Sequence, residues 1–155
     1  MRQLLMIIAV FLTCSVSAQK IEVKKDMIFV GGAQYAIIQQ YGCHAIDSPC
    51  AYLIRSVDGK KLFAIKQQSY IEQGQGSIRY LEYIFFKLNR IAETDFLSGG
   101  SLLDPITIAR KVVQLRLLDN GILNDEAAYD FVIRNGTPYT DKKRQQQSGG
   151  PHLRK

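Results

Sequence analysis

Two cysteines, Cys43 and Cys50, carry the most distinctive chemistry in this chain of 155 residues. A pair of thiols can form a disulfide, bind a metal ion or cycle between oxidised and reduced states. Redox sites typically place Cys-x-x-Cys at the start of a helix, which lowers the pKa of one thiol. Here six residues of a turn-rich segment separate the cysteines, so the spacing does not favour a redox site.

A zinc site is a second interpretation of this segment, because Cys43, His44, Asp47 and Cys50 are all residue types that bind zinc. Their spacing does not match the ligand pairs of structural zinc sites, and no second ligand cluster follows. A catalytic Cys43–His44 dyad is disfavoured, since neighbouring side chains of an extended segment point to opposite faces. We therefore expect no metal ion and no cofactor.

The first eighteen residues predict export. Arg2 precedes an uninterrupted apolar run over 4–12, and small residues lead up to Ala18, where a signal peptidase would cleave. The run is too short for a membrane-spanning helix, which needs about 18 apolar residues or more. We expect a mature chain that starts at Gln19 and is periplasmic or extracellular, with a lipid anchor at Cys14 as the weaker alternative.

Export favours one interpretation of the cysteines. After cleavage at Ala18, Cys43 and Cys50 are the two cysteines of the mature chain. An even number of cysteines in an exported protein favours a structural disulfide. Closing a loop of this size would stabilise the fold by about 2.5 kcal/mol.

No catalytic motif is present elsewhere. The sequence lacks a Gly-x-Ser-x-Gly nucleophile elbow, a His-Glu-x-x-His zinc motif and a phosphate-binding Gly-x-x-x-x-Gly-Lys loop. Glu93 and Asp95 form a carboxylate pair, which we expect to be solvated in a loop. We therefore expect no catalytic residue, and a small hydrolase or thiol-redox enzyme centred on the Cys43–Cys50 loop is the alternative.

The formal net charge of +6 lies mostly at the C-terminus. Residues 141–155 hold five Lys or Arg and one Asp, whereas 19–140 hold 14 basic and 13 acidic residues. A nearly neutral body argues against nucleic-acid binding. The tail has too few apolar residues to fold, so we expect disorder. Lys142, Lys143 and Arg144 are its expected contacts with an anionic envelope polymer or protein.

Strand patterns dominate the first half of the chain. Gly31-Gly32 and Asp58-Gly59 are typical hairpin turns. Residues 67–77 have the composition of a loop, and 78–88 are apolar on both faces, as in a central strand covered twice. We expect strands over 21–25, 27–30, 33–41, 51–57, 61–66 and 78–88.

Two helices are expected in the second half. Asp104-Pro105 supplies an N-cap and a first helical residue, and Asn120-Gly121 ends this helix. Asn124 caps a second helix over 125–134.

The expected fold is a single α+β domain over 19–140. It is an antiparallel meander of four to five strands followed by two C-terminal helices packed on one face. The second face of the sheet is then either covered by long loops or open to a partner.

Several short segments consist of turn and cap residues: Asp26-Met-Ile-Phe-Val-Gly-Gly-Ala-Gln-Tyr35, Asp58-Gly-Lys-Lys-Leu62, Leu118-Asp-Asn-Gly-Ile-Leu-Asn-Asp-Glu-Ala127 and Phe131-Val-Ile-Arg-Asn-Gly136. In these segments the chain resembles uncharacterised exported proteins of Bacteroidota-type bacteria. The resemblance implies a bacterial envelope location and transfers no catalytic residue. The expected function is that of an exported, non-catalytic protein that binds or scaffolds an envelope partner through the open sheet face.

Overall fold

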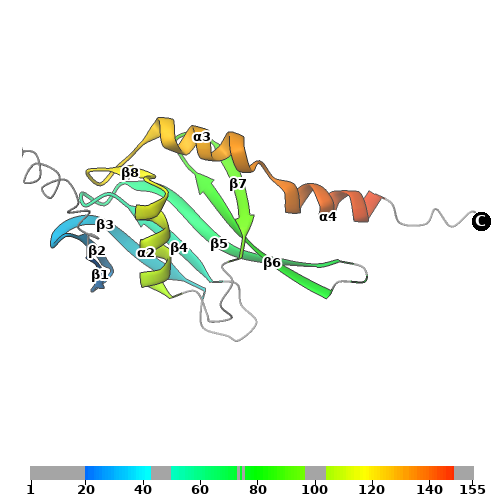
Figure 1. The fold of residues 1–155 in the computed structure, drawn as a ribbon, viewed down its shortest axis with the longest axis horizontal. Coiled ribbons are helices and arrows are strands. Elements are labelled where there is room, and N and C mark those ends of the chain that lie inside the picture. The colour runs from blue at the N-terminus through cyan, green and yellow to red at the C-terminus, as the bar shows by residue number, and fades with distance from the viewer. Residues whose placement is uncertain (1–19, 43–49, 73, 75, 97–103, 149–155) are drawn as a thin grey trace, which may run out of the picture.

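The chain folds into a long antiparallel sheet with helices against one face (Figure 1). The computed structural model describes residues 20–42, 50–72, 74, 76–96 and 104–148. The predicted α+β class, the meander and the placement of the helices are confirmed, but the sheet has seven strands rather than four to five. In sheet order they are β1 (Ile21–Lys24), β2 (Met27–Val30), β3 (Ala33–Tyr41), β4 (Ala51–Arg55), β5 (Lys61–Glu72), β6 (Gly76–Phe85) and β7 (Arg90–Asp95).

Alternating side chains give the sheet an apolar inner face. Ile38 pairs with Ile54, Ile54 with Phe63, and Phe63 with Phe85, so one row crosses four strands. These four side chains are buried, and the Phe63 and Phe85 rings lie 5.4 Å apart between centroids. A neighbouring buried row consists of Tyr52, Ile65, Tyr83 and Ala92. Burying each large side chain stabilises the fold by about 1.5–3 kcal/mol.

The β5–β6 hairpin is longer than the sequence predicts. Residues 67–77 were expected as a loop, yet they pair in register from Gln67 opposite Leu81 to Glu72 opposite Gly76. Backbone pairing with β6 satisfies the peptide groups of this polar stretch, so it needs no hydrophobic alternation to form a strand.

The predicted strand over 78–88 is also wrong at its end. Strand β6 stops at Phe85, and the chain reverses at Asn89, which has a φ of +49°. Asn tolerates this left-handed conformation because its short side chain bonds the local backbone. The reversal creates β7, which is a separate strand at the edge of the sheet.

Both predicted helix caps are confirmed. Helix α2 (Pro105–Gln114) starts after Asp104, whose carboxylate accepts a hydrogen bond from the Thr107 amide at 2.6 Å. Helix α3 (Asp125–Asn135) starts after Asn124, whose side chain accepts from the Ala127 amide at 3.0 Å. These bonds satisfy N–H groups that the first helical turn leaves free.

Helix α2 ends earlier than predicted. Asn120-Gly121 is the turn of a small hairpin, β8 (Leu118–Asp119) and β9 (Ile122–Leu123), instead of the stop of α2. Gly121 has a φ of +78°, and a Cβ there would lie 2.6 Å from the carbonyl oxygen of Tyr35. Only glycine fits this close approach between the hairpin and β3.

The helices lie against the inner face. Helix α2 packs over β1 and β3, and α3 packs along β7. Phe131 of α3 meets Tyr83 and Phe85 of β6 with ring centroids 4.9 and 6.1 Å apart. The inner rows of the sheet and the helices therefore share one core.

The expectation of disorder from Asp141 onward is wrong for residues 141–148. They belong to helix α4 (Pro138–Ser148), which continues the line of α3 beyond a bend at residues 136–137 and runs beside the β5–β6 hairpin (Figure 1). None of its residues is fully buried, and Tyr139 in its first turn is half-buried. The helix forms because Glu93 caps its first turn, as described below. The predicted signal peptide and residues 149–155 lie outside the described residues.

Candidate functional site

The cysteine segment is described only at its end. Cys43, His44 and Asp47 lie outside the described residues, and Cys50 is buried directly before β4. The disulfide between Cys43 and Cys50 therefore stays a prediction. Among the described residues no group of three or more His, Cys, Asp or Glu side chains is placed to hold a metal ion.

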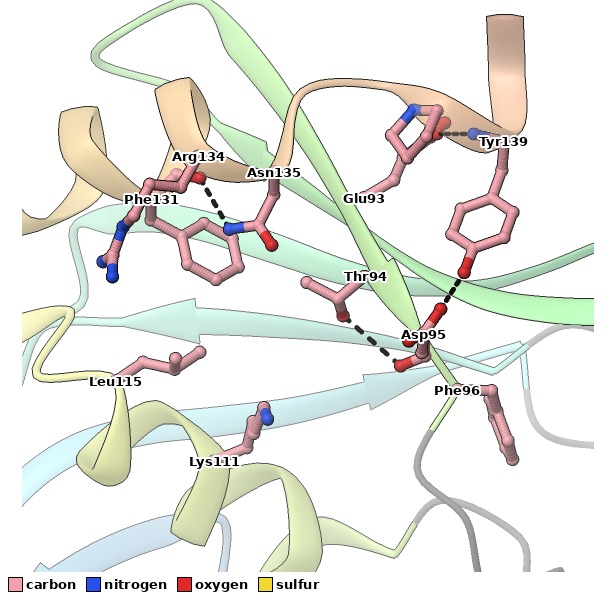
Figure 2. Close-up of a pocket in the computed structure, with 11 residues that line it drawn as sticks. Glu93, Thr94, Asp95, Phe96, Lys111, Leu115, Phe131, Arg134, Asn135 and Tyr139 are labelled. Atoms are coloured by element: carbon pink, nitrogen blue, oxygen red, sulfur yellow. Dashed lines mark hydrogen bonds between the residues drawn. The ribbon is translucent and has the colours of Figure 1, made fainter. Parts of the chain in front are cut away.

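An open cleft of about 600 Å³ is present among the described residues. It lies between α2, α3 and strand β7, where α4 begins (Figure 2). Its volume falls within the range of small-molecule sites, which is about 300–1,000 Å³. The sequence does not predict this cleft, because its walls come from elements far apart in the chain.

Strand β7 forms one wall of the cleft and separates two sets of side chains. Thr94 is on the same face as the buried Ala92, whereas Glu93 and Asp95 are on the opposite face. The backbone amide of Glu93 donates to the carbonyl of Gly136 at 2.9 Å. The bend between α3 and α4 thus covers this sheet edge, which would otherwise expose unpaired backbone groups.

The sequence predicted that Glu93 is a solvated loop residue, and this prediction is wrong. Glu93 is instead the N-terminal anchor of α4. Its carboxylate is 1% exposed and accepts hydrogen bonds from the amides of Tyr139 and Thr140 at 2.8 and 3.0 Å, and from the Thr140 hydroxyl. A negative charge at this end also complements the helix dipole. Every one of these contacts serves the attachment of α4, so Glu93 has a structural role.

Asp95 serves the same attachment. It accepts a hydrogen bond from the Tyr139 phenol, and this bond raises the pKa of Tyr139 to about 12 (Figure 2). The Tyr139 ring stacks on Tyr80 at 4.7 Å and meets Tyr70 at 6.3 Å between centroids. The carboxylate pair flagged in the sequence therefore fastens α4 to β7, and the arrangement does not resemble a general acid–base pair.

Two basic side chains complete the cleft. Lys111 comes from α2 and Arg134 from α3, on facing walls (Figure 2). Among the described residues neither lies in an ion pair. Leu115 and Phe131 supply apolar surface between them, and Phe96 lies at the far end of the cleft, next to Asp95 (Figure 2).

The face of the sheet opposite the helices carries an apolar row of its own. Leu53 pairs with Ala64, Ala64 with Ile84, and Ile84 with Ile91, so this row crosses β4, β5, β6 and β7. We call this side of the sheet the outer face. The two-sided apolar pattern of the predicted strand over 78–88 was the sequence signal for it.

A shallow depression of about 390 Å³ lies on the outer face. Tyr41, Leu53 and Ala64 line it, and the depression is bordered by Arg55, Lys61 and Lys66. Of the described helices, only the start of α4 reaches this side of the sheet, at Tyr70 and Tyr80. The depression is thus an apolar floor with a basic rim.

The predicted partner contacts Lys142, Lys143 and Arg144 lie on α4. Successive helical residues point about 100° apart, so the three side chains do not form one patch. The Lys142 ammonium is 4.0 Å from Glu72, and the Arg144 guanidinium is 3.8 Å from Asp141. Such exposed pairs contribute about 0–1 kcal/mol and leave the side chains accessible.

Comparisons of the chain with protein-family models, curated proteins and solved structures find no match. In the described part of the chain, no helix is both long enough and apolar enough to cross a membrane.

Proposed function

We propose that this chain is an exported, non-catalytic binding module whose outer face docks an acidic partner protein of the cell envelope. Export follows from the predicted signal peptide over residues 1–18. The observation that carries the binding role is the apolar row of the outer face, from Leu53 to Ile91, which no described helix covers.

The chemistry of the outer face indicates the kind of partner. Exposed apolar side chains on it include Tyr41 and Ile91, at 45% and 42% exposure. Within the row, exposure rises from 8% at Leu53 to 42% at Ile91, and exposed apolar surface with a polar rim is typical of a protein-binding site. The rim supplies Arg55, Lys61 and Lys66, so charge complementarity favours an acidic partner.

The cleft carboxylates support a non-catalytic role. Glu93 and Asp95 are the acidic residues of the cleft, and both accept hydrogen bonds that hold α4 in place. A general acid or base must instead reach the substrate proton.

Size analysis of native complexes tests the proposal. In extracts of producing cells, the wild-type protein should migrate in a complex larger than the purified chain. Ala64→Glu places a carboxylate on the floor of the depression and should release the monomer. Ile133→Glu is the matched control, because Ile133 is exposed on α3, away from the outer face. Equal migration of all three proteins would contradict the proposal, and so would a purified chain that already forms the complex alone.

One observation favours the enzyme alternative. The apolar depression extends to Tyr41 and Ala51, which lie close to the two ends of the Cys43–Cys50 segment. A thiol enzyme would use such a surface for substrate. Mass spectrometry after alkylation of the native protein separates the two ideas. Two alkylated thiols would support the thiol enzyme. A protein that takes up two labels only after reduction would support the structural disulfide.

A further inference from the structure

We propose that the cleft between α2, α3 and β7 binds a small amphipathic carboxylate, with the acid head at Lys111 and Arg134 and the apolar body against Leu115 and Phe131. The site is separate from the outer face, so this inference does not depend on the docking proposal.

The hydrogen-bond inventory of the cleft determines the charge of the ligand. The two acidic side chains of its wall are occupied, Glu93 by three donors of α4 and Asp95 by the Tyr139 phenol. The two basic side chains have no acidic partner among the described residues. The charged groups of the cleft that lack a described partner of opposite sign are therefore cationic.

The two basic side chains come from different helices, so an acid head held by both would bridge α2 and α3. Lys111 is half-buried on α2, and Arg134 is exposed on the facing wall, on α3 (Figure 2). The Nε group of Arg134 donates to the carbonyl of Asp130 at 3.3 Å, which leaves its terminal nitrogens available. A guanidinium presents a planar fork that matches a carboxylate.

The rest of the lining determines the body of the ligand. Phe131 is buried beneath the cleft, and Leu115 and Phe96 pack against the core from its sides. A hydrocarbon chain has no polar groups that would be left unpaired against these side chains, and its transfer out of water is favourable in free energy. The combination of one acid head and an apolar body describes a medium-chain fatty acid.

Calorimetric titration of the purified mature chain with decanoate tests the proposal. We expect one binding site for decanoate. The Lys111→Gln/Arg134→Gln variant loses both charged hydrogen bonds, so it should bind decanoate at least about tenfold more weakly than the wild type. The matched control is Lys143→Gln/Arg144→Gln, which removes the same charge from α4 and should bind decanoate like the wild type. Decanol, which has the same chain without the charge, should bind at least about tenfold more weakly than decanoate.

The proposal would be overturned by no binding of decanoate, by equal loss in the control variant, or by equal affinity for decanol. Inorganic phosphate that binds as tightly as decanoate would also overturn it, because the apolar body would then be irrelevant. Leu115→Glu gives a second check should the double variant fold poorly, since a carboxylate in the cleft must repel the ligand. Ala64→Glu, on the outer face, should leave decanoate binding unchanged, so failure of the docking proposal is measured separately.

Discussion

At the scale of single residues, a few polar groups decide how the C-terminal half is arranged. The caps Asp104 and Asn124 could be predicted from the sequence, because each bonds an amide three residues away. Glu93 could not, because its partners Tyr139 and Thr140 are 46 and 47 residues further along. Local patterns carry no information about such a distant contact, so the anchored helix was predicted as a disordered tail.

Glu93→Gln tests this anchor. Glutamine keeps the size of the side chain but removes the charge and offers one acceptor oxygen in place of two. We expect the free energy of unfolding to fall by about 1–2 kcal/mol. Hydrogen exchange should speed up at the amides of Tyr139 and Thr140. Glu126→Gln is the control, because Glu126 is exposed on α3, and it should leave these two amides as protected as before. Equal deprotection in both variants would contradict the role of Glu93 as the anchor.

At the scale of elements, the strands with strong alternation were predictable and the polar or edge strands were not. Strands β2, β3 and β4 alternate or are apolar, and their positions follow from the sequence. The outer half of β5 is polar and is a strand only because β6 pairs with it. Helix α4 likewise depends on a neighbour, through the cluster of Tyr70, Tyr80 and Tyr139.

Tyr70→Ala tests whether this tyrosine cluster joins the hairpin to α4. Tyr70 is 6% exposed, so truncation should destabilise the protein by about 2–3 kcal/mol and increase exchange along α4. Ile71 is the control, because it is the next residue of the same strand and is 78% exposed. Ile71→Ala should change the free energy of unfolding by less than about 0.5 kcal/mol. If both substitutions changed the free energy of unfolding and the exchange along α4 equally, the tyrosine cluster would not be what holds α4 on the hairpin.

At the scale of the whole molecule, buried and bonded tyrosines make the fold sensitive to alkali. The pKa of Tyr52, Tyr83 and Tyr139 is raised to about 12, by burial for the first two and by the bond to Asp95 for the third. In the unfolded chain tyrosine ionises near pH 10, at about its ordinary pKa.

The sign of the pH effect follows from this difference. Because the folded pKa lies above the unfolded one, the stabilisation is fully present below about pH 10. It is lost as the pH rises through about 12. We expect the free energy of unfolding, measured with denaturant, to fall across this range. Tyrosinate absorbance that appears fully before any loss of stability would contradict the assignment.

The architecture also separates two surfaces that could each bind a ligand. Helices α2 and α3 cover the inner face and form the cleft at its edge, whereas the outer face presents the row from Leu53 to Ile91. The sequence pattern indicated a two-sided sheet, but only the register showed which residues share the outer face.

The most direct test of the outer face is site-specific photo-crosslinking in producing cells. Benzoylphenylalanine would replace Tyr41 on the outer face or Tyr129 on α3, two tyrosines with 45% and 54% exposure. We expect one discrete adduct from position 41, lost when Lys61 and Lys66 are both changed to Glu, and no such adduct from position 129. An adduct of equal yield at both positions, or none at position 41, would contradict it.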